Sequence, residues 1–467
     1  MDGDRLTGRN IASVVVILTG TFVAMLNNTL LNPALPSIMA DHDATAGTVQ
    51  WLASGYTLAI AVVIPLSAYL LGRFRASRLF MGALSVFLAG SLLVGWGPSF
   101  PVLLVGRILQ GLCVGVLLPM NATLVVLTLP KRRRGMAMGL VALALGVAPA
   151  VGPTIAGLLI DSVGWHVMFL LLAPIAAILI VVGRVFLESP ARFERIGLDA
   201  PSLALSTAGL ICLLLGFGTF AEEGLRLVAI ALAVVGTALI ALFVRRQGRL
   251  EQPLLRVAVL RIGPLAINVS IVFLMLSALM GISLVIPLYI QNTLGLSATV
   301  NGLVLLPGAA LSAAMSMVAG TLYDKIGVRG LAIGGCLACI VGAIGMALLA
   351  ADSSPLVLMA CYLVFVTGLL TSLTALNTWG IASLPDALVQ HGNAVTNTVN
   401  QVGSAFGMAF MTSMTTLGSS LAVGSAEEVA FAGQHCAFVT VAVIVGICLV
   451  AVIVFARDHE RGLYDGE

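Results

Sequence analysis

The 467-residue chain has little charge, because only 9% of its residues are Asp, Glu, Lys or Arg, against about 25% in soluble domains. Aromatic residues make up 6% and the formal net charge is +3, which leaves neither the basic field nor the stacking surface that nucleic acid requires. A water-soluble domain and a nucleic-acid partner are therefore excluded. The excess is in apolar residues, at 60%, and these are the residues that a lipid bilayer solvates.

The chain also lacks clustered reactive groups. Its seven cysteines lie in or beside apolar stretches, where a thiol is a small inert group. Cys336 and Cys339 form a C-x-x-C with no His or acid nearby, so we expect no disulfide, metal or cofactor. The five histidines lie outside the apolar stretches or at their ends, and no H-E-x-x-H occurs. We therefore expect no enzymatic activity.

Apolar stretches of about 20 residues, the length that crosses a bilayer as a helix, recur along the whole chain. Fourteen spans are predicted, with short connections: 11–36, 49–71, 79–98, 101–128, 136–160, 167–187, 201–220, 226–244, 264–290, 300–322, 330–350, 355–376, 393–422 and 436–456. The first span is long and has no cleavage site, so we expect it in the mature protein. The sequence thus predicts an all-α membrane protein whose site lies inside the membrane.

Lys and Arg are unevenly distributed over the connections. Of the 23, all but two fall in the tails or in and beside alternate connections, the exceptions being Arg226 and, inside the fourth span, Arg107. The connection after the twelfth span is an alternate one that has no Lys or Arg. Because basic connections stay in the cytoplasm, we expect a multi-pass protein of the cytoplasmic (inner) cell membrane with both termini cytoplasmic. The basic stretch 245–262 is expected to be a solvated loop, with a helix lying along the inner surface as the alternative.

The sequence repeats itself at long range. AYLLGRFRASR begins at Ala68 and GTLYDKIGVRG begins 252 residues later at Gly320, and both follow one pattern of small, Leu and basic residues. This offset is longer than six spans occupy, so two further spans must separate the halves. We predict two six-helix bundles, 1–188 and 263–467, joined by a segment, 189–262, with two additional helices and a basic linker.

At these residues the chain resembles the major facilitator superfamily, and within it the fourteen-helix drug:proton antiporters. The loop pattern G-x-L-x-D-R-x-G-R-R is matched well by the second copy and poorly by the first, where Gly72 replaces the acid. The fourth span carries R-I-L-Q-G from Arg107, and LNNTLLNPALPSIM from Leu26 is similar to the lincomycin-resistance-type exporters of bacteria. The antiporter pattern of the fifth span is matched at Gly146, Gly152, Pro153 and Gly157, followed by Trp165, Phe169 and Pro174.

The resemblance implies a major facilitator fold and a secondary active transporter that exports amphipathic drugs and other organic compounds by alternating access. It also implies antiport with protons, and we expect a monomer in the lipid bilayer. Every Asp and Glu, however, falls at a span end or in a connection, whereas a drug:proton antiporter ordinarily uses an acid within the membrane. A facilitator or importer of a small metabolite, without proton coupling, is therefore the alternative. Asp161, at the outer end of the fifth span, is the candidate for proton coupling, and a plain interfacial acid is its other interpretation.

Arg107 needs polar partners, since an ionised Arg inside a span costs roughly 2.5–3.5 kcal/mol on insertion scales. Asn27 and Asn28 lie at a similar depth, so we expect the fourth span to dock Arg107 against the first; snorkelling to the outer surface is the alternative. Asn397 and Gln401 share one helical stripe that should face inward, as cavity lining or as hydrogen-bonding groups. Six residues are predicted to line or brace the substrate cavity: Asn27, Asn28, Arg107, Gln110, Asn397 and Gln401.

Charged residues at the cytoplasmic helix ends are candidates for a gate. An acid beside a basic cluster can hold two helices together and release them as the bundles rock. The predicted gate consists of Arg73, Asp324, Lys325 and Arg329; loop charges that only fix the topology are the alternative. The glycines of the fifth span provide either a packing seam or a seal between the halves.

Overall fold

The computed structural model describes residues 8–128, 131–187, 199–220, 224–250, 253 and 255–456, and within them the regular structure is helical, with no strand. The α-helices are α1 Gly8–His42, α2 Ala46–Arg73, α3 Ala76–Trp96, α4 Phe100–Thr128, α5 Lys131–Leu170, α6 Leu172–Phe186, α7 Ala200–Thr219, α8 Arg226–Gln247, α9 Gly263–Leu288, α10 Ala298–Ala347, α11 Pro355–Ala382, α12 Asp386–Leu421 and α13 Ala426–Phe455. A 3₁₀ turn, Val257–Arg261, precedes α9, and a π-helical turn, Tyr289–Thr293, follows it.

Two of the longest helices are kinked at a glycine. Gly164 in α5 has φ 82° and Gly327 in α10 has φ 75°, values that only glycine adopts at little cost. Each kink marks the boundary between two spans. When α10 is divided at Gly327, and the end of α5 beyond Gly164 is counted with α6, the helices correspond to the fourteen predicted spans. The last span begins at Ala426, ten residues before the prediction, because Ser425 and Glu428 form a capping box there.

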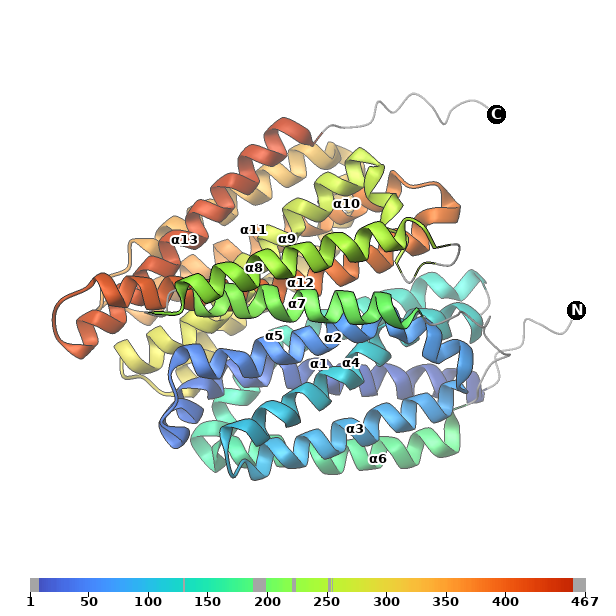
Figure 1. Cartoon of the computed structure of the whole chain (residues 1–467), viewed down its shortest axis with the longest axis horizontal. Coiled ribbons are helices and arrows are strands. Elements are labelled where there is room, and N and C mark those ends of the chain that lie inside the picture. The colour runs from blue at the N-terminus through green and yellow to red at the C-terminus, as the bar shows by residue number, and fades with distance from the viewer. Residues whose placement is uncertain are drawn as a thin grey trace, which may run out of the picture.

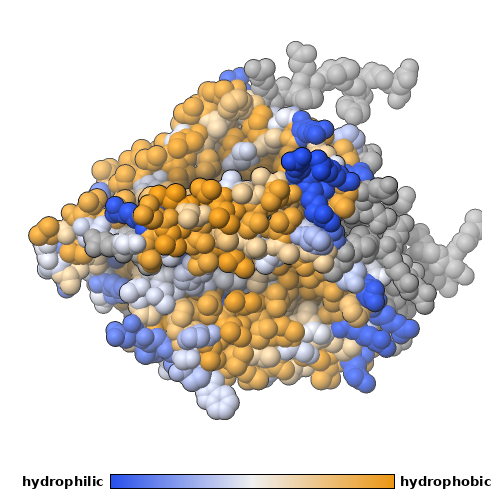
Figure 2. All heavy atoms as spheres, in the orientation of Figure 1, coloured by the Kyte–Doolittle hydropathy of each residue, from blue (hydrophilic) through white to orange (hydrophobic). Residues whose placement is uncertain are grey.

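Hydropathy separates the surface of the molecule into a band and two ends. Eleven helical stretches of the described residues are long and apolar enough to cross a membrane. Figure 2 shows a broad apolar region across the middle, with strongly hydrophilic residues gathered toward the ends. We call the end that holds connections 73–76 and 247–263 the basic end. The opposite end holds connections 42–46 and 293–298.

The helices form two groups with separate cores. Helices α1–α6 pack around one cluster of buried apolar side chains and α9–α13 around another. Helices α7 and α8 run side by side between the two groups (Figure 1), and α7 packs on α2 and α12. The predicted architecture of six, two and six helices is therefore confirmed. The limits 1–188, 189–262 and 263–467 remain predictions.

The two halves meet along two seams, α5 with α10 and α2 with α12. In the first seam the Thr154 hydroxyl donates to the Gly302 carbonyl at 3.0 Å. In the second, the Ser54 hydroxyl lies 3.5 Å from the Ala405 carbonyl. Gln291 adds a hydrogen bond of 3.0 Å to a carbonyl of α1. These contacts lie toward the end opposite the basic end, so the halves are joined there.

Candidate functional site

Arg107 of α4 is fully buried, at 0% exposure. Its Nη1 donates to Gln110 Oε1 at 2.9 Å and lies 3.5 Å from the Asn27 carbonyl. Its Nε donates to the Leu52 carbonyl at 3.3 Å, and the guanidinium carbon lies 4.3 Å from the centre of the Tyr56 ring. Helix α4 thus docks Arg107 against α1, as expected, and also against α2. The alternative, snorkelling to the outer surface, is wrong.

Five side chains form one buried polar cluster that joins α1, α2, α3 and α4: Asn27, Tyr56, Ser91, Arg107 and Gln110. Asn27 Nδ2 donates to Gln110 Oε1 at 3.0 Å, and Gln110 Nε2 donates to Ser91 Oγ at 3.1 Å. The Tyr56 hydroxyl donates to a backbone carbonyl of α1 at 2.8 Å. Gln110 is therefore the hub, because its single amide contacts three other members.

The cluster holds a cation without an acid. Within the described part of the chain, no Asp or Glu is among the buried polar residues. Carbonyl oxygens and the faces of Tyr56 and Phe169, at 4.3 and 5.9 Å, surround the guanidinium instead. Arg107 Nη2 and Asn27 Oδ1 have no hydrogen-bond partner. A buried ion that is incompletely bonded is costly, so this cluster is a place where a change of partner or of hydration has a large effect.

Glycines allow the cluster to form, because they let neighbouring helices approach α4 closely. A Cβ atom on Gly115 would lie 2.7 Å from the Cβ of Val63 in α2. A Cβ on Gly106 would lie 2.8 Å from the Gly90 carbonyl of α3. Without a hydrophobic force between helices in lipid, such contacts between small residues hold the bundle together. They bring Tyr56 and Ser91 within reach of α4.

The antiporter pattern of α5 lies at a junction of helices. A Cβ on Gly157 would come within 2.8 Å of Thr299 Cα, and a Cβ on Gly302 would come within 2.6 Å of the Pro153 carbonyl. A Cβ on Gly152 would instead overlap Thr29 of α1. Gly157 and Pro153 therefore pack against the other half, while Gly152 packs within its own half. Gly146 lies in α5, and its surroundings are outside the described part of the structure.

Asp161 is exposed at the end of this seam, in the last turns of α5 before Gly164. Its Oδ2 accepts a hydrogen bond of 2.8 Å from the backbone N–H of Thr299, in the first turn of α10. A carboxylate at a helix N-terminus satisfies a free N–H and faces the positive end of the helix dipole. Asp161 is thus a cap supplied by one half to a helix of the other half.

The predicted gate residues lie at the basic end. Arg73 ends α2, and Lys325 and Arg329 flank the kink at Gly327; all three charged side chains are exposed. Arg329 Nη2 lies 3.4 Å from the Ile453 carbonyl of α13, a contact within the second half. The side chain of Asp324 is outside the described part of the structure. The gate therefore stays a prediction.

The remaining predicted cavity residues are separate from the cluster. Asn28 is half-buried beside Asn27, while in α12 Asn397 is exposed and Gln401 is half-buried. The structure thus brings Asn27, Arg107 and Gln110 together and leaves Asn397 and Gln401 on another helix, in the other half.

Sequence reasoning missed several polar residues in this region. Tyr56 and Ser91 belong to the cluster, and their signal was a polar group in the middle of an apolar span. Gln50 and Asn301 are also fully buried. In each of them, both the oxygen and the nitrogen of the side-chain amide have no hydrogen-bond partner. Gln50 lies in α2, one partner of the second seam. Asn301 lies in the first turns of α10, on the face that meets α5.

Two halves of bilayer-length helices, packed against each other at one end, define the architecture of a secondary transporter. The family model described as Major Facilitator Superfamily matches residues 17–408, and the chain belongs to this superfamily. It is therefore a multi-pass membrane transporter of small molecules and not an enzyme.

Curated relatives cover most of the chain. The MFS-type transporter YcnB of Bacillus subtilis is 33% identical over 92% of each chain, and the lincomycin resistance protein LmrB of Listeria monocytogenes is 32% identical over 92% of each chain. The tetracenomycin C resistance and export protein of Streptomyces glaucescens is 28% identical over 87% of this chain and 76% of its own. Resistance and export proteins, among them a homologue of multidrug resistance protein B from Mycobacterium tuberculosis, are thus among the homologues.

Solved structures share the fold. A bacterial homologue of the human lysosomal transporter Spinster, crystallised in an inward-facing and unoccupied conformation, superposes with a TM-score of 0.72. The match covers 96% of this chain and 97% of that chain at 13% sequence identity, so it bears on the fold alone.

Proposed function

We propose that this transporter exports amphipathic organic compounds, lincomycin among them, from the cytoplasm by alternating access. The observation that carries the proposal is the buried cluster around Arg107, built on the same R-I-L-Q-G and LNNTLLNP segments that resemble the lincomycin-resistance-type exporters. The relatives named for lincomycin resistance and tetracenomycin C export support the substrate class. In this proposal Asn27, Arg107 and Gln110 brace the cavity, and Asn28, Asn397 and Gln401 line it.

The seams support the alternating movement. The basic end faces the cytoplasm in this proposal, with both termini on that side, because 73–76 and 247–263 carry arginines. The seams through Gly157 and Ser54 then close the extracellular side, and the halves of a monomer rock about the cavity. At the basic end, Arg73, Asp324, Lys325 and Arg329 latch the halves when that side closes.

Proton antiport is the proposed source of energy. Asp161 is a titratable group at the closed seam, where its carboxylate caps α10. In this proposal the cap is lost when the halves separate. Protonation of Asp161 from the outside weakens this cap, because a neutral carboxyl group no longer interacts with the helix dipole as a charge. The proton thereby favours opening of the extracellular side.

A transport panel tests the substrate class. Expression in a drug-sensitive host should raise resistance to lincomycin and other amphipathic compounds, and Arg107→Ala should remove it. Tyr362→Ala, which truncates a buried side chain of the second half, controls for a loss of packing. If Arg107→Ala retains full resistance at equal expression, the cluster has no part in transport.

Reconstituted vesicles test the coupling. An imposed pH gradient should drive uptake of the drug into inverted vesicles, and Asp161→Asn should weaken this response. The second candidate function, facilitated passage of a small metabolite, is favoured by one observation: in the described residues no carboxylate is buried. Transport that is indifferent to the pH gradient would support this second function.

A further inference from the structure

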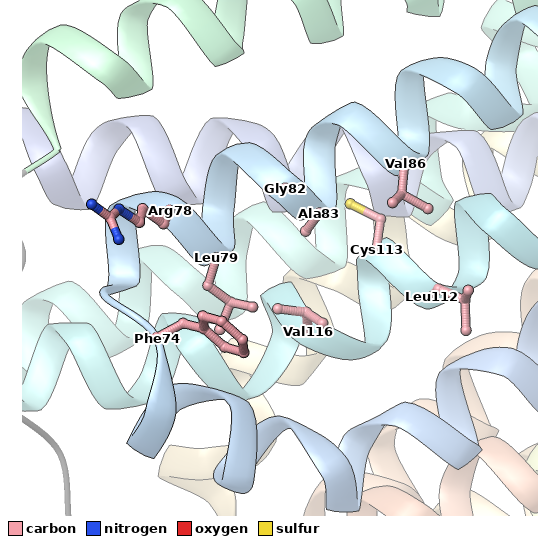
Figure 3. A pocket seen from close by; sticks show the side chains of 9 residues that line it. All are labelled: Phe74, Arg78, Leu79, Gly82, Ala83, Val86, Leu112, Cys113 and Val116. Carbon is pink, nitrogen blue, oxygen red and sulfur yellow. The ribbon is translucent and has the colours of Figure 1, made fainter.

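A groove of about 300 Å³ lies between α3 and α4, near the basic end. Its wall on α3 includes Leu79, Ala83 and Val86, and its floor on α4 consists of Leu112, Cys113 and Val116. Figure 3 shows these apolar side chains in succession along the two helices. The wall from Leu79 to Val86 extends for about 10 Å, at about 1.5 Å per residue. The groove is thus an elongated apolar site, within the size range of ligand pockets.

Gly82 in the wall has no role in packing. A Cβ atom at this position would meet no atom within 4 Å. Gly90, farther along α3, shows the usual reason for a glycine in a membrane helix, because its Cβ would lie 2.6 Å from the Gly106 carbonyl. A glycine inside a helix is unfavourable relative to Ala. At Gly82 the missing side chain leaves space for a molecule other than the protein.

The end of the groove nearest the basic end of the molecule is positively charged. Arg78 and Phe74 line this end, and Figure 3 shows the guanidinium of Arg78 beyond the apolar side chains. Arg73 and Arg75 belong to the same turn, and all three arginines are exposed. In the described part of the chain no ion pair is found for any of them. The combination of an elongated apolar wall and an unpaired cationic end is complementary to an acidic lipid.

We propose that this groove binds an anionic phospholipid from the leaflet at the basic end. One acyl chain lies along α3 against Gly82, and the phosphate contacts Arg78. A phospholipid fits better than an exported compound, because Phe74, Arg78 and Gly82 are all exposed at the surface and the groove lies outside the buried polar cluster. Arg–phosphate contacts are strong and directional.

The second half supplies a matched control. Gly334 follows Gly82 by 252 residues, the offset of the sequence repeat, and its Cβ would also meet no atom within 4 Å. The position that corresponds to Arg78 is Gly330. Gly334→Leu therefore adds the same side chain to the equivalent helix face, where no arginine stands at the position that corresponds to Arg78.

Binding of dioleoyl phosphatidylglycerol and dioleoyl phosphatidylcholine to the detergent-purified transporter, measured by native mass spectrometry, tests the proposal. We expect the natural protein to prefer phosphatidylglycerol about tenfold, because only the net negative lipid gains from Arg78. Gly82→Leu should lower binding of both lipids at least about tenfold by filling the groove. Arg78→Gln should remove the preference and leave the weaker binding. Gly334→Leu should behave as the natural protein.

Equal binding of the two lipids to the natural protein, or full binding to Gly82→Leu, would overturn the proposal. The proposal would also be overturned if an amphipathic drug displaced the lipid and Gly82→Leu lost binding of the drug but kept binding of the lipid. That result would assign the groove to the exported compound. If Gly82→Leu does not fold, Gly82→Val fills less of the groove, and Arg78→Gln tests the charge independently.

Discussion

The two halves cross their helices in the same way but fill the crossings differently. In the first half a Cβ on Gly90 would lie 3.1 Å from the backbone nitrogen of Gln110. In the second half a Cβ on Gly342, which is 252 residues farther on, would lie 2.5 Å from the backbone nitrogen of Phe365. Gln110 and Phe365 therefore occupy equivalent places, on α4 and α11.

The residues around these places differ in chemistry. Arg107 and Gln110 of the first half correspond to Tyr362 and Phe365 of the second, and all four are buried. One half thus encloses a cation and its hydrogen bonds, and the other encloses two aromatic rings at the same crossing. The shared backbone contact shows that the fold needs the glycines. The difference shows that the polar cluster is an addition to the fold, which points to function.

The largest expected effect comes from removing the hub of the cluster. Gln110→Leu takes away the acceptor of Arg107 Nη1 and of Asn27 Nδ2, and should cost about 2–4 kcal/mol because a buried charge loses its partner. Phe365→Leu, its counterpart, removes only apolar contacts and should cost about 1–2 kcal/mol. Unfolding in detergent measures both. Equal costs would break the comparison between the halves.

Two buried asparagines sharpen the comparison. Asn27 donates to Gln110 at 3.0 Å, whereas neither side-chain polar atom of Asn301 has a partner. Asn27→Leu should therefore destabilise by about 1–3 kcal/mol. Asn301→Leu should be neutral or stabilising, because it removes an amide that is buried at a cost. Thermal unfolding of the two variants at equal detergent concentration compares their losses of stability. A larger loss of stability for Asn301→Leu than for Asn27→Leu would contradict this prediction.

Asp161 links the first half to the second through a single cap. Asp161→Asn should weaken it by about 0.5–1 kcal/mol, which raises the open population of the seam about two- to fivefold. The labelling rate of Thr154→Cys by a membrane-impermeant thiol reagent reports this opening. Ser162→Ala is the control, because the Ser162 hydroxyl bonds only to carbonyls of its own helix. Equal labelling of both variants would show that Asp161 does not control opening of this seam.

The smallest effect concerns the helices that belong to neither half. Arg246 Nε and Nη2 donate to Asp199 at 2.7 and 2.8 Å, and the hydrogen bonds from Arg246 and Ser202 lower the pKa of Asp199 to about 2. The stabilisation that the ionised Asp199 gives to the folded protein is present above the ordinary carboxyl pKa of 3.8. It is lost as the pH falls from there through about 2. Because both side chains of the pair are in contact with solvent, Asp199→Asn should lower the Tm less than any variant above. The difference in Tm between the natural protein and Asp199→Asn should vanish at the acid end of a pH series. A difference that stays constant with pH would show that ionisation of Asp199 does not stabilise the fold.

Much of the fold could be predicted because the bilayer limits what a helix can be. Apolar length located the fourteen spans, and the repeat at Ala68 and Gly320 located the two additional helices. Helix ends were less accurate where polar residues extend a helix beyond the membrane. Helix α13 is an example, since Glu427 and Glu428 occupy its first turn.

The site could be predicted only in part. The cost of a charge in a span required partners for Arg107, and Asn27 at similar depth was found from helix geometry. Ser91 was missed because a single Ser hydroxyl in a span bonds to its own helix in most cases. Tyr56 was missed because its hydrogen bond to α1 joins residues 32 positions apart. The contact of Asp161 with Thr299 joins residues 138 positions apart in different halves, so no local pattern reports it.

The seam between α5 and α10 has a consequence for how such a transporter can change. Gly157 and Gly302 bring the two backbones together, with few side chains between them. A closure made of main chain is independent of the side chains that select a compound. The interior can therefore acquire new specificities by substitution while the barrier to leakage stays intact.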